Sequence, residues 1–480
     1  MAVENPLDAF LKPQSVAVIG ATERPGAWGS FIMEGLLSRN YPGRIYPVNR
    51  NAEQVYGIPA YKDIMEVNGP IDLAVLTIPA KFAEEAIDLC GRKGVKGVTI
   101  ITADFGEAYA GGKEKEKALV YLARRYGMRL LGPNISGTFN LHAEFNASGG
   151  PGRLVQPTGL AAICQGGYAF YDILAAGANR NMGVGKFIHT GNETDLTVTD
   201  FLEHFGPDPE VKGILMYLET IRDGRRFIET ARKVSRVKPV VVYKAGRTPG
   251  SARAALSHTG ALSGVKEIYN GLLHQAGLVI SPTMELLLPL SHALVERPPL
   301  KGPRVAIVTM GGSWGVSLSD ALEEAGLEVV ELSAKVQKKL RDMGMPRWAS
   351  TRNPVDIGAS GLFFERDTLV GLGREVLASG EVDGLILHGV GRPGLVPPDA
   401  NKKRKMFLEI NKQVIRDYAA LEKELELPVL VGSHFSPWES QEVWDLNQEG
   451  LRVYQRLNDL AQILSLMDKF WKRRLGNQEG

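Results

Sequence analysis

The fold is decided by residues 15–29, which read Ser-Val-Ala-Val-Ile-Gly-Ala-Thr-Glu-Arg-Pro-Gly-Ala-Trp-Gly. The apolar run at the start is typical of a buried strand that ends at Gly20, and a helical pattern follows through Ile32 and Leu36. A glycine-rich turn at the start of a helix presents backbone N–H groups and the positive end of the helix dipole to a phosphate. Such a turn can also serve simply to connect two elements. Its spacing is not Gly-x-Gly-x-x-Gly, so it does not match the dinucleotide fingerprint.

The same succession of strand, glycine turn and helix recurs twice along the chain. Residues 160–163 lead into Gln165-Gly166-Gly167, and residues 304–309 lead into Gly311-Gly312-Ser313. Further apolar strands alternate with helical patterns, at residues 44–49, 72–78, 97–102, 128–131, 187–190, 213–218, 239–244, 384–387 and 428–432. This alternation predicts an α/β fold built of doubly wound parallel sheets. Breaks rich in glycine and proline divide the chain into predicted domains at residues 1–150, 151–296 and 304–480.

The composition is that of a globular protein. The chain has 480 residues, of which 44% are hydrophobic and 23% are charged, and its formal net charge is +2. A charge so near zero gives no strong attraction to nucleic acid or membrane, and the sequence has no apolar run of the roughly 18 residues that span a bilayer. Two cysteines do not make a disulfide framework, and residues 1–12 hold no apolar stretch of signal-peptide length. We therefore expect a cytoplasmic protein that binds neither nucleic acid nor membrane.

His258 differs from the other histidines because small residues surround it, in Ser257-His258-Thr259-Gly260. It follows a buried strand, and the carboxyl ends of parallel strands meet at one edge of a sheet. Glu193, Asp195 and Glu219 also follow strands of this domain, so a carboxylate there would orient the imidazole ring. No second histidine or cysteine lies at ligand spacing, so we expect no metal. Alternatively, His258 is hydrogen-bonded at a helix start and Glu219 caps a helix.

Helices that begin at glycine turns, together with a histidine on a loop, indicate a phosphoryl group. Backbone N–H groups and helix dipoles neutralise phosphate oxygens, and charge stabilisation of this kind is the main requirement of phosphoryl transfer. A neutral imidazole ring can accept the phosphoryl group as a nucleophile. Two such helices, from different domains, could bracket one phosphohistidine.

Taken in order, the motifs resemble those of the α subunit of NDP-forming acyl-CoA synthetases of the ADP-forming acetyl-CoA synthetase type, relatives of succinyl-CoA synthetase. The most specific match is Ser257-His-Thr-Gly260 with the preceding Lys244-Ala-Gly246. The remaining matches gain weight from their order, and they are Ser15-Val-Ala-Val-Ile-Gly-Ala-Thr22 with Pro25-Gly26, Tyr46-Pro-Val-Asn49, Asp72-Leu-Ala-Val75, Gly132-Pro-Asn134, Gly191-Asn-Glu193 with Asp195, Tyr217-Leu-Glu219, Arg304-Val-Ala-Ile-Val-Thr309 and Asn353-Pro-Val-Asp356. They extend over nearly the whole chain.

The resemblance implies a Rossmann-like CoA-binding domain followed by two flavodoxin-like domains, the first of which carries His258. It implies that His258 is transiently phosphorylated and that Glu219 orients it. The helices aimed at the phosphate would begin at Gln165, Gly166 and Gly167 and at Gly311, Gly312 and Ser313. CoA would lie over Gly20, Thr22, Pro25, Asn49, Ile78, Pro79 and Ala80.

The resemblance also implies a reaction and a partner. The reaction is that of an acid–CoA ligase, which interconverts acyl-CoA, ADP and phosphate with a small carboxylic acid, ATP and CoA through an acyl phosphate and a phosphohistidine. The family's ATP-grasp module, which binds ATP or ADP with Mg²⁺, is not found in these 480 residues. We therefore expect that module on a separate β subunit, in an α2β2 assembly.

The chain departs from the family pattern at three places. Gly166 stands where the family usually has serine, which removes one hydroxyl that could bind phosphate, and Ile135 stands where it usually has cysteine. Ser313 and Trp314 follow the third glycine turn, where the family usually has Gly-Gly-Pro-Gly, so the acid could be larger than acetate or aromatic. These departures leave one alternative open, a non-catalytic CoA-binding regulator of the same fold. A nicotinamide dehydrogenase is disfavoured because the glycine fingerprint fails.

Overall fold

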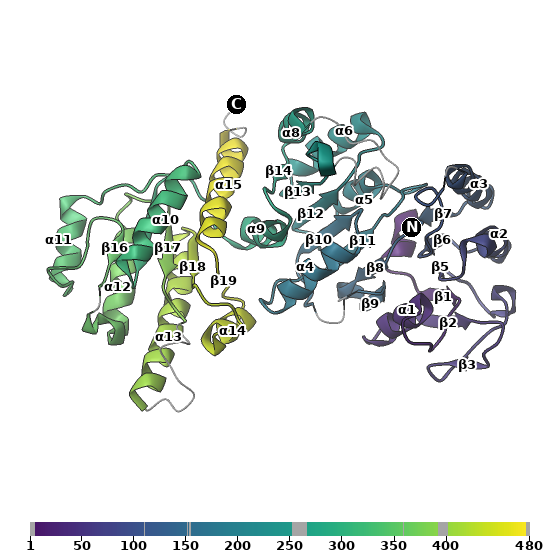
Figure 1. The fold of residues 1–480 in the computed structure, drawn as a ribbon, viewed down its shortest axis with the longest axis horizontal. Coiled ribbons are helices and arrows are strands. Elements are labelled where there is room, and N and C mark those ends of the chain that lie inside the picture. Colours follow the sequence, from purple (N-terminus) through teal and green to yellow (C-terminus); the bar gives the residue numbers. More distant parts are fainter. Residues whose placement is uncertain are drawn as a thin grey trace. The chain divides into compact units, whose positions relative to one another are not determined.

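The computed structural model describes residues 5–109, 111–150, 152, 155–251, 266–358, 360–391 and 402–476 (Figure 1). The chain divides into two compact units. The first unit comprises Met1–Ala178 and Met182–Ser291, and the second comprises Asn179–Asn181 and His292–Gly480. Over the described ranges, no helix is long and apolar enough to cross a membrane.

The first sheet of the first unit has five parallel strands in the order β2-β1-β5-β6-β7 (Figure 1). Successive side chains of a strand point to opposite faces, so Val16 and Val18 of β1 pack with Ile32 of α1, whereas Ala17 packs with Ile87 of α2. The elements of this part are η1 (Pro6–Phe10), β1 (Ser15–Ile19), α1 (Trp28–Leu37), β2 (Arg44–Val48), β3 (Gln54–Val55), β4 (Ile58–Pro59), η2 (Ile64–Glu66), β5 (Leu73–Leu76), η3 (Ala80–Phe82), α2 (Ala83–Lys93), β6 (Gly97–Ile100), α3 (Gly112–Arg125) and β7 (Arg129–Leu131). This strand order reverses between β1 and β5, where open α/β sheets bind their ligands.

The second sheet of the first unit has seven strands in the order β14-β13-β12-β10-β11-β8-β9. Its strands are β8 (Gly137–Asn140), β9 (Phe145–Ser148), β10 (Leu160–Cys164), β11 (Lys186–His189), β12 (Gly213–Leu218), β13 (Val240–Lys244) and β14 (Val279–Ile280). Its helical elements are η4 (Leu141–Ala143), α4 (Tyr168–Ala178), α5 (Val198–Phe205), α6 (Gly224–Ser235) and α8 (Lys266–Gln275). Helix α9 (Met284–Glu296) begins in the first unit and ends in the second.

This sheet is not wholly parallel, because β8 runs antiparallel to β11 and β9 antiparallel to β8. Residues 137–148, which the glycine- and proline-rich break predicted to end the first domain, pair with strands of the second sheet. Pairing covers the edge of β11, which would otherwise leave unsatisfied backbone groups. Helix α1 of the first sheet packs against the same hairpin: a Cβ atom at Gly35 would lie 2.8 Å from the carbonyl oxygens of Asn146 and Ser148. The two sheets of this unit therefore share one core, which contains Ile32 and Phe145.

The second unit contains a five-stranded parallel sheet in the order β16-β15-β17-β18-β19. Its elements are β15 (Val305–Thr309), α10 (Gly312–Glu324), α11 (Ala334–Asp342), β16 (Val355–Asp356), η6 (Gly361–Phe364), α12 (Arg366–Leu377), β17 (Gly384–His388), α13 (Lys402–Leu425), β18 (Val429–Gly432), α14 (Gln441–Gln448), β19 (Val453–Tyr454) and α15 (Leu457–Gly476). Its core contains Ala306, Leu385 and Val431 from the strands. Thus the strand, glycine turn and helix predicted at residues 304–322 form as β15 and α10.

Candidate functional site

A cavity of about 650 Å³ lies within the first unit, where strands of both its sheets end. Glycines 166 and 167 line it at the start of α4, and Glu219 lines it directly after β12. The remaining lining residues are Arg24, Trp28, Thr77, Ile78, Pro79, Ile101, Thr102, Ala103, Asn134, Ile135, Ser136, Gln165, His189, Gly191, Asn192 and Tyr217. The cavity therefore joins the N-terminal end of a helix, which attracts anions, to a buried carboxylate and to the turn after β5.

The two glycines at the start of α4 are required by close neighbours. A Cβ atom at Gly166 would lie 2.8 Å from Cε1 of Tyr217, and one at Gly167 would lie 2.7 Å from Cε1 of His189. Both distances are shorter than ordinary carbon–carbon contacts. The tyrosine ring thus occupies the space that the family's usual serine at residue 166 would need.

Gln165 does not present its side-chain amide to the cavity as a free phosphate ligand. Its Oε1 accepts hydrogen bonds from the backbone N–H groups of Glu219, at 2.6 Å, and Thr220, at 2.9 Å. Its Nε2 donates to the carbonyl oxygen of Thr220 at 3.0 Å. The amide therefore fastens the end of β12 to the end of β10.

Glu219 is 5% exposed. The hydroxyl group of Tyr217 donates a hydrogen bond to Oε1 of Glu219 at 3.4 Å. Burial, followed by the charge of Glu219, raises the pKa of Tyr217, so the phenol stays protonated and remains a donor. A cavity that holds a buried carboxylate, a phenol and a helix start can orient an imidazole ring and bind a phosphate. His258, the predicted phosphoryl acceptor, lies outside the described residues.

His189, which the sequence did not single out, also lines this cavity. It is the last residue of β11, and its Nδ1 accepts a hydrogen bond from the backbone N–H of Ser136 at 2.8 Å. Its Nε2 lies 3.0 Å from the carbonyl oxygen of Gln165 and donates to it, which identifies the neutral tautomer. The signal that could have found it is its position at a strand end before Gly191.

Glu193 and Asp195 follow β11 at the same edge of the sheet as Glu219, as expected, because β10 runs parallel to both β11 and β12. Their side chains, however, do not line the cavity. Oε1 of Glu193 accepts the N–H of Val198 at 2.9 Å, at the first turn of α5. Burial raises the pKa of Glu193 to about 7. Asp195 has a fully buried side chain that pairs with Arg129 at 2.8 Å and with Arg124 at 2.9 Å. Both carboxylates therefore stabilise the loop after β11 rather than face a substrate.

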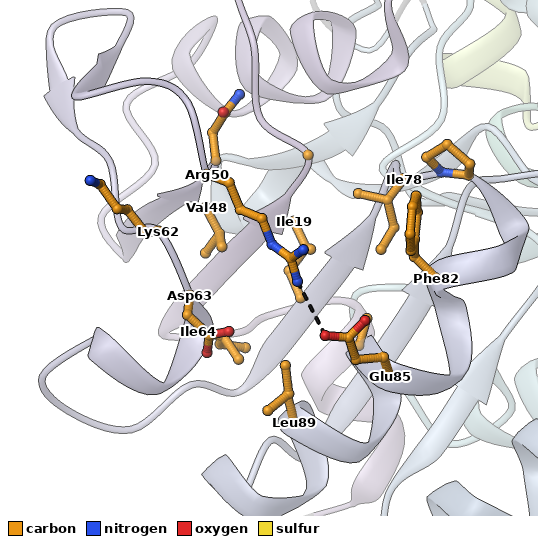
Figure 2. Close-up of a pocket in the computed structure, with 14 residues that line it drawn as sticks. Ile19, Val48, Arg50, Lys62, Asp63, Ile64, Ile78, Phe82, Glu85 and Leu89 are labelled. Atoms are coloured by element: carbon orange, nitrogen blue, oxygen red, sulfur yellow. Dashed lines mark hydrogen bonds and ion pairs between the residues drawn. The ribbon is translucent and has the colours of Figure 1, made fainter.

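A second cavity, of about 330 Å³, lies at the carboxyl ends of β1 and β5 (Figure 2). Four residues of the predicted CoA set line it, namely Gly20, Asn49, Ile78 and Pro79, whereas Thr22, Pro25 and Ala80 do not. Arg50 also lines it, as expected for a residue that follows the strand at residues 44–49. The lining residues that the sequence did not indicate are Ile19, Val48, Lys62, Asp63, Ile64, Phe82, Glu85, Ala86 and Leu89. Arg50 reaches across the cavity to Glu85, with 3.2 Å between Nη2 and Oε1 (Figure 2).

The wall of this cavity requires glycine at residue 20. Gly20 has a φ of +96°, and a Cβ atom there would lie 2.7 Å from Oγ1 of Thr77. Asn49 links the two neighbouring strand ends, because its Nδ2 donates to the carbonyl oxygen of Ala21 at 2.7 Å and its Oδ1 accepts from the N–H of Asn51 at 2.8 Å. The walls of this cavity are largely apolar, and its charged lining residues are the basic Arg50 and Lys62 with the acidic Asp63 and Glu85. Apolar walls with a few polar groups suit a nucleotide such as the adenosine end of CoA.

The third glycine turn lies in the second unit. Gly311 is the N-cap of α10, and its N–H donates to Oγ1 of Thr309 at 3.1 Å. Ser313 is exposed. The ring of Trp314 lies 5.2 Å from those of His388 and His434, two neighbours that the sequence motifs did not indicate. The bracketing of one phosphate by α4 and α10 stays a prediction. In the part of the chain that the structure describes, no three histidine, cysteine or acidic side chains are grouped as metal ligands.

The comparisons with known proteins agree with this architecture. A family model described as a CoA binding domain matches residues 14–138, and one described as a succinyl-CoA ligase like flavodoxin domain matches residues 157–294. The α subunit of ADP-forming acetate–CoA ligase I from Pyrococcus furiosus is 34% identical over 485 residues, which cover 98% of this chain and 99% of that subunit. The α subunit of ligase II from the same organism is 41% identical over 354 residues, covering 74% of this chain and 76% of that subunit.

A solved structure has the same fold over its full length. The acetyl-coenzyme A synthetase 1 of Ca. Korarchaeum cryptofilum, in complex with phosphate and ADP, superposes with a TM-score of 0.85 at 30% identity and covers 99% of each chain. The fold and its two matched domains define a protein of the succinyl-CoA ligase type. Within that type, the chain belongs to the ADP-forming acyl-CoA synthetase family, which confirms the resemblance drawn from the motifs.

Proposed function

We propose that this chain is the catalytic α subunit of an ADP-forming acid–CoA ligase. The observation that carries the proposal is the 650 Å³ cavity, in which the glycine start of α4 faces Glu219. A helix start of this kind stabilises phosphate oxygens, and a buried carboxylate orients a histidine. Non-catalytic CoA binding is the weaker alternative, because Tyr217 fills the place of the missing serine and keeps a hydroxyl group beside Glu219.

The proposed reaction has three steps. An oxygen of inorganic phosphate attacks the thioester carbonyl, the C–S bond breaks, and the CoA thiolate leaves and takes up a proton. A ring nitrogen of His258 then attacks the phosphorus of the acyl phosphate, whose P–O bond to the acyl group breaks and releases the carboxylate. An oxygen of ADP attacks the phosphohistidine, and the P–N bond breaks to give ATP and the free imidazole. Glu219 holds the ring throughout, and the α4 N-terminus neutralises the phosphoryl oxygens.

CoA is assigned to the first sheet of the first unit. Gly20, Asn49, Ile78 and Pro79 form the walls of the 330 Å³ cavity, while Ile78 and Pro79 also line the larger cavity. CoA would therefore lie with its nucleotide end in the 330 Å³ cavity and its thiol end in the 650 Å³ cavity, toward Glu219. Arg50 and Lys62 would supply cationic groups at the rim.

ATP, ADP and Mg²⁺ are assigned to a separate ATP-grasp β subunit, in an α2β2 assembly. Support comes from the full-length relative, which is itself an α subunit. Mg²⁺ would neutralise the nucleotide phosphates on that partner. The acid is a small carboxylic acid. Trp314 and the imidazole rings of His388 and His434 form an aromatic group, which would suit an aromatic acid.

The proposal is tested by phosphorylation of the chain. The subunit is mixed with its ATP-grasp partner and γ-³²P-labelled ATP, and the label should be lost in acid and kept in alkali, as for phosphohistidine. His258→Ala should abolish the label, and added acid with CoA should discharge it from the wild type. Label that persists in His258→Ala would contradict the proposal, and CoA binding without any label would favour the regulator.

A further inference from the structure

The main chain at Glu219 is held from both sides. On one side, Oε1 of Gln165 accepts the N–H of Glu219 at 2.6 Å. On the other side, Nζ of Lys244 donates to the carbonyl oxygen of Glu219 at 2.7 Å. The residue whose carboxylate enters the larger cavity therefore has both of its own backbone polar groups bound by side chains from neighbouring strands.

Lys244 is an unusual residue for this position. It ends β13, is 2% exposed, and is among the largest fully buried side chains. Its Nζ also donates to the carbonyl oxygen of Ala245 at 2.5 Å and lies 4.6 Å from the ring centre of Tyr269, in the first turns of α8. Burying an ammonium group is costly unless its protons are bound, and here they are bound by carbonyl groups and an aromatic face.

The hydrogen bond from Lys244 holds the peptide group of Glu219 in place, but an uncharged hydrogen-bond donor would hold it equally well. What lysine adds is a positive charge behind the Glu219 carboxylate. In the proposed reaction, that carboxylate and a phosphoryl group would occupy the same cavity and repel each other. A buried cation beside them offsets this repulsion strongly, because screening by water is weak there.

We propose that Lys244 is a positioning residue of the phosphoryl-transfer site, which acts through Glu219 by holding its peptide and by placing a fixed positive charge behind its carboxylate. This inference rests on the proposed function. Gln165 shares the mechanical part of the task, because its amide binds the peptide from the other side. Of these two residues, only Lys244 carries a positive charge.

Lys238 provides a matched control. It lies just before β13 begins, whereas Lys244 ends that strand. Its Nζ likewise donates to two backbone carbonyl groups, those of Phe205, at 2.9 Å, and Asp208. Lys238→Met therefore removes the same kind of lysine–carbonyl contact without touching Glu219. A merely structural role for Lys244 would make the two methionine variants behave alike.

The first test measures steady-state kinetics of Lys244→Met and Lys238→Met with the ATP-grasp partner. We expect Lys244→Met to lower kcat by about 100-fold, the effect of misplacing a reacting group by about 1 Å. KM for CoA should stay within about twofold, because Lys244 does not line the CoA cavity. Lys238→Met should keep kcat within about twofold, as expected when reacting groups stay in place. Equal kcat values in both variants would overturn the inference.

The second test is the pH profile, and it includes Lys244→Arg. The groups that face Nζ are Glu219 after β12, Arg247 after β13 and Tyr269 of α8. Burial lowers the pKa of Lys244 to about 8, although Glu219 opposes the shift. The charge is thus present at neutral pH and is lost as pH rises through about 8, so wild-type kcat should fall there.

The variants should change that alkaline fall in opposite ways. Lys244→Arg keeps its charge to far higher pH, so its kcat should stay level above pH 8 where that of the wild type falls. Lys244→Met should have low kcat at every pH and no fall near 8. An unchanged alkaline fall in Lys244→Arg would overturn the inference while the labelling of wild-type protein still upheld the proposed function. Wild-type protein that takes no label would overturn both.

Discussion

Gly166 lies directly against the ring of Tyr217, so that a Cβ atom at residue 166 would be 2.8 Å from Cε1 of that ring and 3.2 Å from Oε1 of Glu219. The glycine is therefore matched to its neighbours, and the serine usual in this family would not fit without a shift of the ring. The pair also explains how the start of α4 approaches the end of β12 closely enough to form one cavity wall.

This contact predicts that Gly166→Ala lowers the rate of phosphoryl transfer. The new methyl group would push Tyr217 or Glu219 away from α4, and a displacement of about 1 Å is expected to lower kcat by about 100-fold. The matched control is Gly224→Ala, because Gly224 also begins a helix, α6, but a Cβ atom there would have no heavy atom within 4 Å. Gly166→Ala combined with Tyr217→Leu should recover part of the rate. A double variant no faster than Gly166→Ala would show that the clash is not the cause.

The buried carboxylate of Asp195 predicts a large effect on stability. It pairs with Arg129 and Arg124, and it accepts the N–H of Leu130 at 2.9 Å. Asp195→Asn should lower the free energy of unfolding by about 2 kcal/mol, because a buried carboxylate loses its charge-assisted hydrogen bonds, while the side chains of Arg129 and Arg124 are 30% and 63% exposed and can be solvated. Urea unfolding measures this change. Asp342→Asn, in the exposed pair with Lys338, should alter it by less than about 1 kcal/mol.

The effect of Asp195 should also depend on pH. Burial raises the pKa of this carboxyl group, but hydrogen bonds from Arg129 and Leu130 outweigh burial and hold it below the usual value. A carboxyl group whose pKa is lowered by folding stabilises the folded state at pH values above its pKa in the unfolded chain, about 3.9. This stabilisation is lost as the pH falls through the pKa of the folded state. The difference between wild type and Asp195→Asn should therefore shrink in acid, and a difference that stays constant down to about pH 2 would contradict this account.

The elements whose signals are local were predictable from sequence, and those that depend on distant partners were not. The glycine turns at residues 20, 166 and 311 follow apolar strands, so periodicity and turn residues predicted β1, β10 and β15 with their helices. The ion pair of Asp195 had no local signal, because its partner Arg129 lies 66 residues away on β7. Nor could periodicity show that β8 pairs antiparallel with β11.

The candidate site divides in the same way. Glu219 was found because it follows a strand, and strand ends meet at one edge of a sheet. The same rule correctly placed Glu193 and Asp195 at that edge. Their side chains nevertheless do not line the cavity, because the rule gives the position of the backbone and not the direction of each side chain. Arg50 follows a strand, but its partner Glu85 was missed because it lies on a separate element that meets Arg50 only across the 330 Å³ cavity of the folded chain (Figure 2).

The positive φ of Gly20 predicts a loss of CoA affinity in Gly20→Ala. The substitution is strained at a φ of +96°, and its Cβ atom would press on Oγ1 of Thr77 and on Ile78 in the cavity wall. Calorimetry should show CoA binding at least about 10-fold weaker, a change of about 1.4 kcal/mol. Gly57→Ala is the control, because its φ of +75° is also positive but its site is open. If Gly57→Ala weakens CoA binding equally, backbone strain rather than the cavity wall is responsible.

The buried carboxyl group of Glu193 predicts that stability falls as pH rises. Burial raises its pKa to about 7, so between the unfolded value of about 4.3 and 7 the folded chain binds more protons than the unfolded chain. Unfolding is then easier at higher pH by about 2–3 kcal/mol between pH 5 and pH 8. Glu193→Gln cannot ionise and keeps an acceptor for the N–H of Val198. Its free energy of unfolding should therefore rise relative to that of the wild type by about 2–3 kcal/mol between pH 5 and pH 8. Glu426→Gln is the control, since Glu426 has the same φ of 53° but is exposed, and its curve should run parallel to that of the wild type. Parallel curves for Glu193→Gln and wild type would show instead that Glu193 ionises near its usual pKa despite its burial.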